Sequence, residues 1–492
     1  MDPLEPTMVS NMNPLVLAAR TSKYDADNPS WEMAMYGPFQ DDFWGAMETE
    51  LDMLENQMHS WELVPRTPDM HVLPSTWAFK IKCFPDGSIK KFKAHFCVRG
   101  DHQKEGIDYF ETWAPVAQWS TIRCAMVLAA KLNLKSVHCD ITAAFLHAEL
   151  PSNEHIYVHQ PRGFKRHPDH VLKLWRTLYG LKQAPRYFFK HLTDCLKLAG
   201  YKQSQFNPCL FHANGSIIIF YVNDLLIYGW TDNDINTIIS SVNELGITLN
   251  REGMAEGFLG IDIRCEGNKT TLSQPGLTKR IIEELGLCSK NSTPTQVPAE
   301  RSPLARNTSA PAYEGPISYG TIIGMLLYLT GHSHPDIAFA VHQCARYTFE
   351  PKDTHMTALK HIGRYLKGTK DKGLTLNPTE DLTIDCYPDA DFAGLWGYKD
   401  SQDPHCIRSC TRYVMTLCGC PILWTSKLQT EIALSTMKAK YVALSTACKD
   451  LFLIMDILNE LCNTLGLQTP SQGNLHVRVH EDNVGTLTLG LL

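Results

Sequence analysis

Two short apolar runs joined by a polar pair constrain the fold of this chain more than any other stretch of its sequence. Residues 216–222 read SIIIFYV and residues 225–229 read LLIYG, with only Asn223 and Asp224 between them. Runs of strand length that are rich in β-branched and aromatic residues, separated by two residues that tolerate positive φ, predict a tight β-hairpin. The sequence therefore predicts that Asp224 lies at the turn of a β-hairpin.

A second acid, Asp140, lies near the end of KSVHCDIT, which we predict to be a strand. Two-metal nucleotidyl transfer needs carboxylates that converge from separate segments, because Mg²⁺ prefers carboxylate and phosphate oxygens and the two ions clamp the attacking and leaving oxygens. Asp140 and residues 223–224 suit this arrangement. An acid at a strand end is more commonly only solvated, so the pattern alone leaves both interpretations open.

The chain is too long for one domain and has the composition of a folded protein. Its 492 residues exceed the ~100–200 of a typical domain, so two or three domains are expected. The first ten residues, MDPLEPTMVS, lack the basic and apolar regions of a signal peptide, and no apolar run approaches the ~20 residues that span a bilayer. Sixteen cysteines without the spacing of a disulfide framework favour a reducing, intracellular compartment.

One cysteine cluster raises the question of a zinc site. The segment HCIRSC runs from His405 to Cys410 and is followed by Cys418 and Cys420. These spacings do not match the usual zinc patterns. We therefore favour a pair of strands that contains cysteines.

A basic stretch lies between Lys80 and Lys104. The formal net charge of −6 argues against a protein that coats nucleic acid. This stretch nevertheless holds seven basic residues against two acidic ones, a local excess of five positive charges. The segments WAFKIKCF and KKFKAHFCVRG, joined by PDGS, predict a basic β-hairpin. Its charge fits either a phosphate-binding surface or an ordinary solvated face.

Periodicity and composition predict the remaining elements. Apolar residues recur at helical spacing over 41–61, 120–134, 319–332 and 356–368. The pattern over 171–200 is mostly helical. From about residue 382 the chain is rich in predicted strands, and a helix is expected after residue 482. Residues 289–316 are dense in Ser, Thr, Pro and Ala, which predicts a linker.

Several long motifs, in order along the chain, resemble the Pol polyprotein of copia-type LTR retrotransposons. They include HCDITAAFLHAELPSNEHIYVHQPRGF, GIDYFETWAPVAQWSTIR, LYGLKQAPRYFF, FYVNDLLIYG and FLGIDI, followed by YLTGHSHPDIAFAVHQCARY, YPDADFAG and HEDNVGTLTL. The resemblance implies an α+β fold, in which a right-hand polymerase of fingers, palm and thumb-like tail is joined to a ribonuclease H-like α/β domain. It also implies an RNA-directed DNA polymerase that uses Mg²⁺ or Mn²⁺, a template with primer, and dNTPs.

The same resemblance divides the chain into five parts. They are a leader or remnant (1–40), the reverse transcriptase (41–288), the linker (289–316), connection helices (317–380) and the ribonuclease H-like domain (381–492), which we expect to be cut short.

The resemblance also implies the site residues. In the polymerase, Asp140 and Asp224 would bind metal, with position 223 as the first of the paired carboxylates. In the ribonuclease H-like domain the metal ligands would include Asp389 and Asp482. Nucleotide and nucleic-acid contacts would come from Lys91, Lys93, Arg99, Gly180, Lys182, Gln183, Phe258, Leu259 and Gly260.

Departures from the family pattern predict impaired chemistry. Asn223 stands where the family has Asp, and Lys438 and Lys440 replace a Glu-x-Glu pair. A net loss of about 4 kcal/mol from a transition state slows a reaction by roughly 10³-fold. His95 and Arg412 also replace the usual Arg and Gly. We expect a degenerate copy with weak or absent polymerase activity and no ribonuclease H activity; the alternative is a non-catalytic protein that binds nucleic acid through the basic hairpin and the palm.

Overall fold

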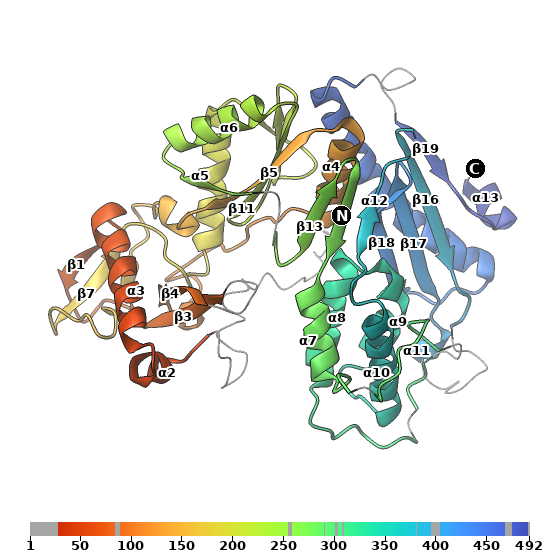
Figure 1. The fold of residues 1–492 in the computed structure, drawn as a ribbon, viewed down its shortest axis with the longest axis horizontal. Coiled ribbons are helices and arrows are strands. Elements are labelled where there is room, and N and C mark those ends of the chain that lie inside the picture. The colour runs from red at the N-terminus through yellow and green to blue at the C-terminus, as the bar shows by residue number, and fades with distance from the viewer. Residues whose placement is uncertain are drawn as a thin grey trace. The chain divides into compact units, whose positions relative to one another are not determined.

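The structure is a computed structural model that describes residues 28–83, 89–253, 258–289, 291–300, 304–307, 309–379, 381–394, 404–467 and 475–490 (Figure 1). The chain folds into two units. Unit 1 contains residues 1–115, 141–198 and 242–248, and unit 2 contains residues 116–140, 199–241 and 249–492. Both units mix helices and strands, in agreement with the predicted α+β class.

Unit 1 contains a four-stranded sheet in the order β1-β7-β6-β2 and the hairpin β3-β4. The strands are β1 (Trp61–Pro65), β2 (Val72–Leu73), β3 (Ser75–Cys83), β4 (Ile89–Val98), β6 (Tyr157–Val158) and β7 (His170–Leu174). The helices are α2 (Trp31–Tyr36), α3 (Gln40–Asp52), which continues as a π-helical turn (Met53–Gln57), and α5 (Ala184–Leu198). The predicted basic hairpin is confirmed as β3 and β4, while the PDGS turn lies outside the described residues.

Aromatic side chains hold α3 against this hairpin. Phe43 of α3 is buried and meets Phe79 of β3 and Phe92 of β4 edge to face, with ring centroids 5.1 and 5.0 Å apart. Met47 and Leu51 are buried on the same helix, as the predicted helical spacing requires. The sequence pattern gives no element before residue 41, yet α2 also packs on β3, since the rings of Trp31 and Phe79 lie 6.2 Å apart.

The prediction of a mostly helical stretch over 171–200 is wrong in its first part. His170–Leu174 forms β7, which pairs with β1 on one side and β6 on the other, and helix α5 begins only at Ala184. A short apolar run such as VLKL cannot be distinguished from a buried helical segment by periodicity alone. Pairing on both sides buries it as a strand.

A close crossing of backbone segments explains two glycines of unit 1. The Val98 amide at the end of β4 donates a hydrogen bond of 2.8 Å to the Tyr179 carbonyl. Gly180 has a φ of 90°, and a Cβ there would lie 2.0 Å from the Val98 carbonyl oxygen. A Cβ at Gly100 would lie 2.0 Å from the Gly180 carbonyl oxygen. Only glycine fits where these two segments cross.

Unit 2 is centred on a six-stranded sheet in the order β12-β5-β11-β10-β9-β8. The strands are β5 (Lys135–Ile141), β8 (Lys202–Gln203), β9 (Leu210–Ala213), β10 (Ser216–Tyr221), β11 (Asp224–Gly229) and β12 (Leu249–Gly253). The predicted hairpin is confirmed as β10 and β11, and both strands are almost wholly buried. The predicted helix over 120–134 is confirmed as α4 (Trp119–Leu132), and α6 (Asp232–Glu244) follows β11.

A group of helices in unit 2 shares one apolar core. The helices are α7 (Pro275–Glu284), α8 (Tyr319–His332), α9 (Ala338–Ala345) and α10 (Asp353–Gly368), and a small sheet is formed by β13 (Asp262–Glu266), β14 (Lys269–Ser273) and β15 (Leu374–Leu376). In the described part of 289–316 no helix or strand is formed, and its carbonyls are held by side chains. His355 and His361 of α10 bond the carbonyls of Ala305 (2.9 Å) and Val297 (3.0 Å).

The C-terminal part of unit 2 is a four-stranded sheet in the order β18-β17-β16-β19, with the long helix α12 packed against β16 and β17 (Figure 1). The elements are β16 (Thr383–Ala390), α11 (Pro404–Ile407), β17 (Cys410–Leu417), β18 (Cys420–Leu428), α12 (Thr436–Thr464), β19 (His476–Val479) and α13 (Val484–Gly490). Cys410, Cys418 and Cys420 lie on the β17–β18 hairpin, as the strand-pair interpretation predicts, whereas Cys406 lies in α11. Within the described ranges, no helix is long and apolar enough to cross a membrane.

A buried arginine links α4 to the C-terminal sheet. Arg123 is only 2% exposed, and its guanidinium lies 4.0 Å from the Trp424 ring of β18 and 5.6 Å from the Trp119 ring. Its Nη1 donates to the Ile422 carbonyl at 3.0 Å and its Nη2 donates to the Gly331 carbonyl. Burial lowers the Arg123 pKa to about 9. Through these backbone carbonyls and indole faces, Arg123 joins α4, α8 and β18.

The crossing at Gly180 can be tested by substitution. We expect Gly180→Ala to lower the free energy of unfolding by about 1–2 kcal/mol for the positive φ and a further 1–3 kcal/mol or so for the overlap with Val98. Gly106→Ala is the matched control, because Gly106 has a φ of 77° but no atom within 4 Å of its Cβ position. Urea unfolding followed by tryptophan fluorescence measures both. Equal losses for the two variants would contradict the close crossing.

Candidate active site

Asp140 and Asp224 lie directly opposite each other at the end of two paired strands. β5 and β11 are antiparallel, and their register pairs Asp224 with Asp140 and Leu226 with His138. Directly opposed residues of an antiparallel pair have Cα atoms about 4.5–5.5 Å apart and side chains on one face of the sheet. The structure therefore brings two of the predicted metal ligands side by side.

The turn between β10 and β11 falls one residue earlier than the sequence pattern indicates. Tyr221 pairs with Asp224, so Val222 and Asn223 form the two-residue turn and Asp224 begins β11. Val222 has a φ of 60°, which is rare for a β-branched residue and costs about 1–3 kcal/mol. Asp224 is thus part of the strand ladder, and the ladder fixes it opposite Asp140.

The amide of Asn223 faces the carboxylate of Asp140. Its Nδ2 donates a hydrogen bond of 2.7 Å to Asp140 Oδ1. An Asp at this position would place a second negative charge there, and two unit charges ~4 Å apart repel by roughly 4 kcal/mol at an effective dielectric of 20. Because the Asn223 amide is neutral, it does not repel the Asp140 carboxylate, and no cation is needed to offset such a repulsion. The Nδ2 group also occupies one acceptor oxygen of Asp140.

His138 is a site residue that the sequence analysis missed. Its Nε2 lies 2.7 Å from Asp224 Oδ1, and its side chain is 6% exposed. The signal was present in the sequence, because residues two apart on a strand share a face and His138 precedes Asp140 by two. The imidazole therefore fixes the orientation of the Asp224 carboxylate.

The predicted segment Phe258 to Gly260 backs this histidine. Phe258 is fully buried, and its ring meets the His138 ring edge to face with centroids 5.4 Å apart. Leu259 and Gly260 have φ values of 53° and 71°, and the Tyr328 hydroxyl donates a 2.6 Å hydrogen bond to the Leu259 carbonyl. The helix α8 thus holds the turn that supports Asp224 through His138.

The predicted residues of unit 1 divide into buried and exposed groups. Gln183 is 1% exposed; its Nε2 donates to the Asp108 carbonyl at 2.8 Å and its Oε1 accepts from Gln103 Nε2 at 3.0 Å. The Lys182 ammonium lies 4.7 Å from the centre of the Tyr109 ring. These contacts hold the loop around Asp108 in place. Gln183 therefore has a structural position beneath this loop and is not exposed on its surface.

Arg99 is paired with an acid on its own loop. Its Nε and Nη2 donate to the two Asp101 oxygens at 2.8 and 2.6 Å. This bidentate contact lowers the pKa of Asp101 to about 2 and raises that of Arg99. His95, which stands where the family usually has Arg, also contacts an acid. Its Nδ1 lies 3.2 Å from Oε1 of Glu50, which is buried.

Lysines face one another across the β3-β4 hairpin. The register pairs Lys80 with Lys93 and Lys82 with Lys91. Like charges directly opposite on an antiparallel pair destabilise it. These four side chains alternate along the two strands with Phe79, Ile81 and Phe92, so they form one cationic face, here called the lysine face. A polyanion bound to this face would relieve the repulsion.

The two predicted acids in the C-terminal part of unit 2 contact one lysine. Lys440 Nζ lies 3.2 Å from Asp389 Oδ1 and also contacts Asp482 Oδ1. Lys438, two residues earlier on α12, is exposed. Arg412 lies opposite Asp389 in the β16–β17 register and its Nη2 is 3.9 Å from Asp391.

The two acidic pairs differ in whether they fit a divalent cation. Mg²⁺ is commonly bound by one or two carboxylates together with substrate phosphates, and Asp140 with Asp224 supplies such a pair. Asp389 and Asp482 do not fit, because an ammonium already lies between them. In the part of the chain that the structure describes, no group of three His, Cys, Asp or Glu side chains is placed to hold a metal ion.

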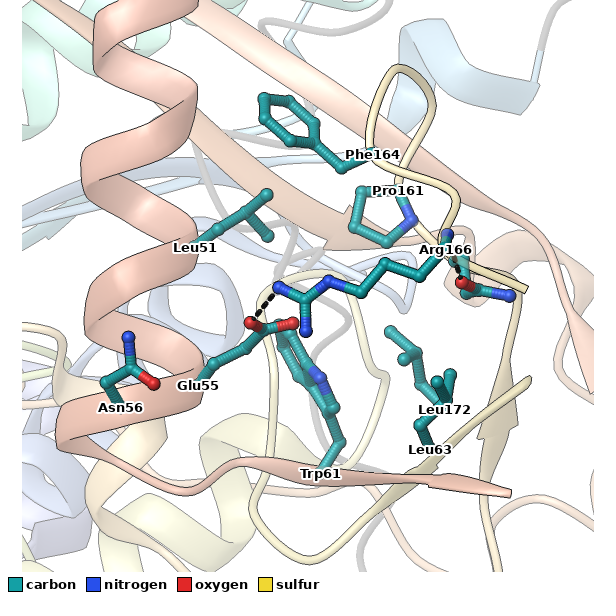
Figure 2. A pocket seen from close by; sticks show the side chains of 10 residues that line it. Leu51, Glu55, Asn56, Trp61, Leu63, Pro161, Phe164, Arg166 and Leu172 are labelled. Atoms are coloured by element: carbon teal, nitrogen blue, oxygen red, sulfur yellow. Dashed lines mark hydrogen bonds and ion pairs between the residues drawn. The ribbon is translucent and has the colours of Figure 1, made fainter. Parts of the chain in front are cut away.

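A pocket in unit 1 lies apart from all the predicted site residues (Figure 2). Arg166 extends across it, and its Nη2 donates to Glu55 Oε2 at 2.5 Å. Its apolar wall includes Leu51, Trp61 and Phe164. The ion pair already satisfies the charged groups of this pocket.

Comparisons with known proteins show similarity to the reverse transcriptase region of retrotransposon Pol polyproteins. Residues 58–300 match the family described as "Reverse transcriptase (RNA-dependent DNA polymerase)". The chain is 32% identical over 456 residues to the retrovirus-related Pol polyprotein from transposon TNT 1-94 of Nicotiana tabacum, with 89% of this chain and 33% of that protein covered. It is 32% identical over 432 residues to the Pol polyprotein from transposon RE2 of Arabidopsis thaliana, with 86% and 28% covered. The chain thus spans about a third of the length of these relatives.

Among solved structures, a foamy viral protease-reverse transcriptase in complex with double-stranded DNA matches with a TM-score of 0.46 and 13% identity. The match covers 91% of this chain and 64% of that one.

The contacts behind the candidate site predict acid sensitivity. Burial lowers the pKa of His332 to about 4, with a further contribution from the charge of Arg123, and the His332 ring packs on Trp119 and Tyr328. Between pH 6.5 and 4 the unfolded chain binds a proton that the folded chain does not, so this group makes stability fall as the pH falls, by at most about 1.4 kcal/mol per pH unit.

We expect His332→Phe to reduce this loss, as measured by urea unfolding at pH 6.5, 5.5 and 4.5. His476→Phe, at an exposed position of β19, is the control. An unchanged pH dependence in His332→Phe would show that His332 does not account for it.

Proposed function

Because this chain belongs to the reverse transcriptase region of copia-type retrotransposon Pol polyproteins, we propose that it is an RNA-directed DNA polymerase centred on Asp140 and Asp224 and weakened by Asn223. The observation that carries this proposal is the register of β5 and β11, which sets the two carboxylates opposite each other. Template, primer and dNTPs are the substrates proposed on the same basis.

The proposal assigns parts of a right-hand polymerase to the two units. The hairpin β3-β4 and its neighbours in unit 1 correspond to fingers, and the six-stranded sheet of unit 2 corresponds to the palm. The turn at Phe258 to Gly260 supports the primer end. Helices α8 to α10 correspond to the connection, and residues 381–492 correspond to the ribonuclease H-like domain.

A divalent ion, Mg²⁺ or Mn²⁺, would be held by Asp140 and Asp224 together with the substrate phosphates. When bound, it supplies charge neutralisation of the attacking and leaving oxygens. The chain's own part is to orient the two carboxylates: the β5–β11 ladder sets their spacing, and His138 holds Asp224 through its 2.7 Å contact. Residues Phe258 to Gly260 keep that histidine in place.

Asn223 weakens this site in two ways. It lacks the negative charge of the family's carboxylate, and its Nδ2 occupies Asp140 Oδ1 at 2.7 Å. Loss of one carboxylate from the cluster removes attraction for the cation of at least about 4 kcal/mol before the amide oxygen returns part of it. We therefore propose one cation site of low affinity and slow chemistry.

Primer extension on an RNA template tests this proposal. We expect Asn223→Asp to extend the primer roughly 10³-fold faster than the unmodified chain, because about 4 kcal/mol of transition-state stabilisation returns. Asn214→Asp, the same change in the turn between β9 and β10, should change nothing. Asp140→Ala should abolish the gain. An unmodified chain as fast as Asn223→Asp would contradict the impairment, and inactivity of Asn223→Asp would contradict the assigned site.

A second candidate function is binding of nucleic acid without catalysis. The lysine face favours it, since Lys80, Lys82, Lys91 and Lys93 oppose one another in two pairs across one hairpin. Each phosphate contact releases counterions, so such binding weakens steeply with salt.

The salt dependence of primer–template binding tests the lysine face. We expect Lys82→Gln combined with Lys91→Gln to reduce the slope of log K against log salt by about 1.4–1.8, since each phosphate contact contributes about 0.7–0.9. Lys165→Gln combined with Lys190→Gln, two exposed lysines of unit 1, is the matched control. Fluorescence anisotropy over a salt series measures both. Equal slopes in the two double variants would rule out phosphate contact by this face.

A further inference from the structure

The Lys440 ammonium lies between Asp389 and Asp482, the two residues that the family resemblance implies as metal ligands. Lys440 lies on the second turn of α12 with a side chain that is 11% exposed, and its Nζ contacts Asp389 at 3.2 Å and also Asp482. Asp389 belongs to β16, and Asp482 lies two residues before the start of α13. The ammonium therefore joins α12 to β16 and to the segment that leads into α13.

The acids around this ammonium repel one another without it. Asp389 and Asp482 are 53% and 78% exposed, and Glu481 lies beside Asp482 in the chain. An ammonium has three N–H donors and one positive charge, so it can bond both carboxylates at once. Lys440 thus supplies the attraction that a divalent ion would otherwise supply here.

We infer that Lys440 is an internal cation that substitutes for a divalent ion. It excludes the ion by charge, and it ties the segment from Asp482 through α13 to α12 and β16, so that this part of unit 2 keeps its structure without metal. The neighbouring contact from Thr486 Oγ1 to the Met437 carbonyl, at 3.3 Å, attaches α13 to the first turn of α12.

Lys438 provides a comparison on the same helix. It is exposed, and its backbone amide donates to the side chain of the N-cap residue Ser435 at 3.1 Å. Residues two apart on a helix point about 200° away from each other. A charge reversal at Lys438 therefore changes the charge of the helix N-terminus without entering the acidic pair.

The number of Mn²⁺ ions bound per chain tests the inference, measured by electron paramagnetic resonance of the free ion. We expect Lys440→Glu to bind one ion more than the unmodified chain, because three carboxylates then converge. Lys438→Glu should bind the same number as the unmodified chain. The Asp140 site is present in all three proteins and cancels in the difference, so its failure to bind would not affect this result.

Two further measurements decide the matter if Lys440→Glu does not fold. In the otherwise unmodified chain, Asp482→Asn should leave the number of bound Mn²⁺ ions unchanged; a loss of one ion would overturn the inference. Lys440→Met should make the amides of residues 484–490 exchange with solvent at least about tenfold faster, because α13 loses its tie. Unchanged exchange would overturn the structural part of the inference.

Discussion

The register between β5 and β11 is the constraint on which the candidate site depends. It sets Asp140 opposite Asp224 and places His138 on the same face. A slip of one residue would send one of the two carboxylates to the other face of the sheet, because side chains alternate along a strand. The side chains of β10 and β11 are buried on both faces of the sheet, so a slip of one residue would disrupt the packing on both faces. Burial of these strands thus determines where the acids meet.

Both acidic pairs of unit 2 are satisfied by the chain itself. At one, the Asn223 amide donates to Asp140; at the other, the Lys440 ammonium joins Asp389 and Asp482. In each case a donor from the chain takes acceptor capacity that a cation would need. The first pair keeps two adjacent carboxylates, and the second has a positive charge between them. Asn223 and Lys440 therefore stabilise the acidic pairs without metal. Lys440 opposes cation binding more strongly, because it carries a positive charge.

Much of the fold could be predicted from the sequence, and the failures have physical causes. The hairpins β3-β4 and β10-β11 have long alternating or apolar runs, and this local pattern is sufficient to predict both hairpins. β7 was missed because VLKL is too short for its period to distinguish strand from helix. Site details depended on tertiary packing: only the structure shows that Lys440 faces the acids while Lys438 does not, that Gln183 is buried, and that His138 contacts Asp224. The turn position shifted by one residue because Val222 adopts a positive φ.

The most direct test of the account is the affinity of the Asp140–Asp224 pair for a single Mn²⁺ ion, measured by titration of the unmodified chain and of Asn223→Asp. The account predicts weak binding in the unmodified chain that is lost in Asp140→Asn, and binding at least about tenfold tighter in Asn223→Asp, because one full negative charge returns to the cluster. Equal affinity in the unmodified chain and Asn223→Asp would show that residue 223 does not contribute to the cation site. That result would contradict the central claim.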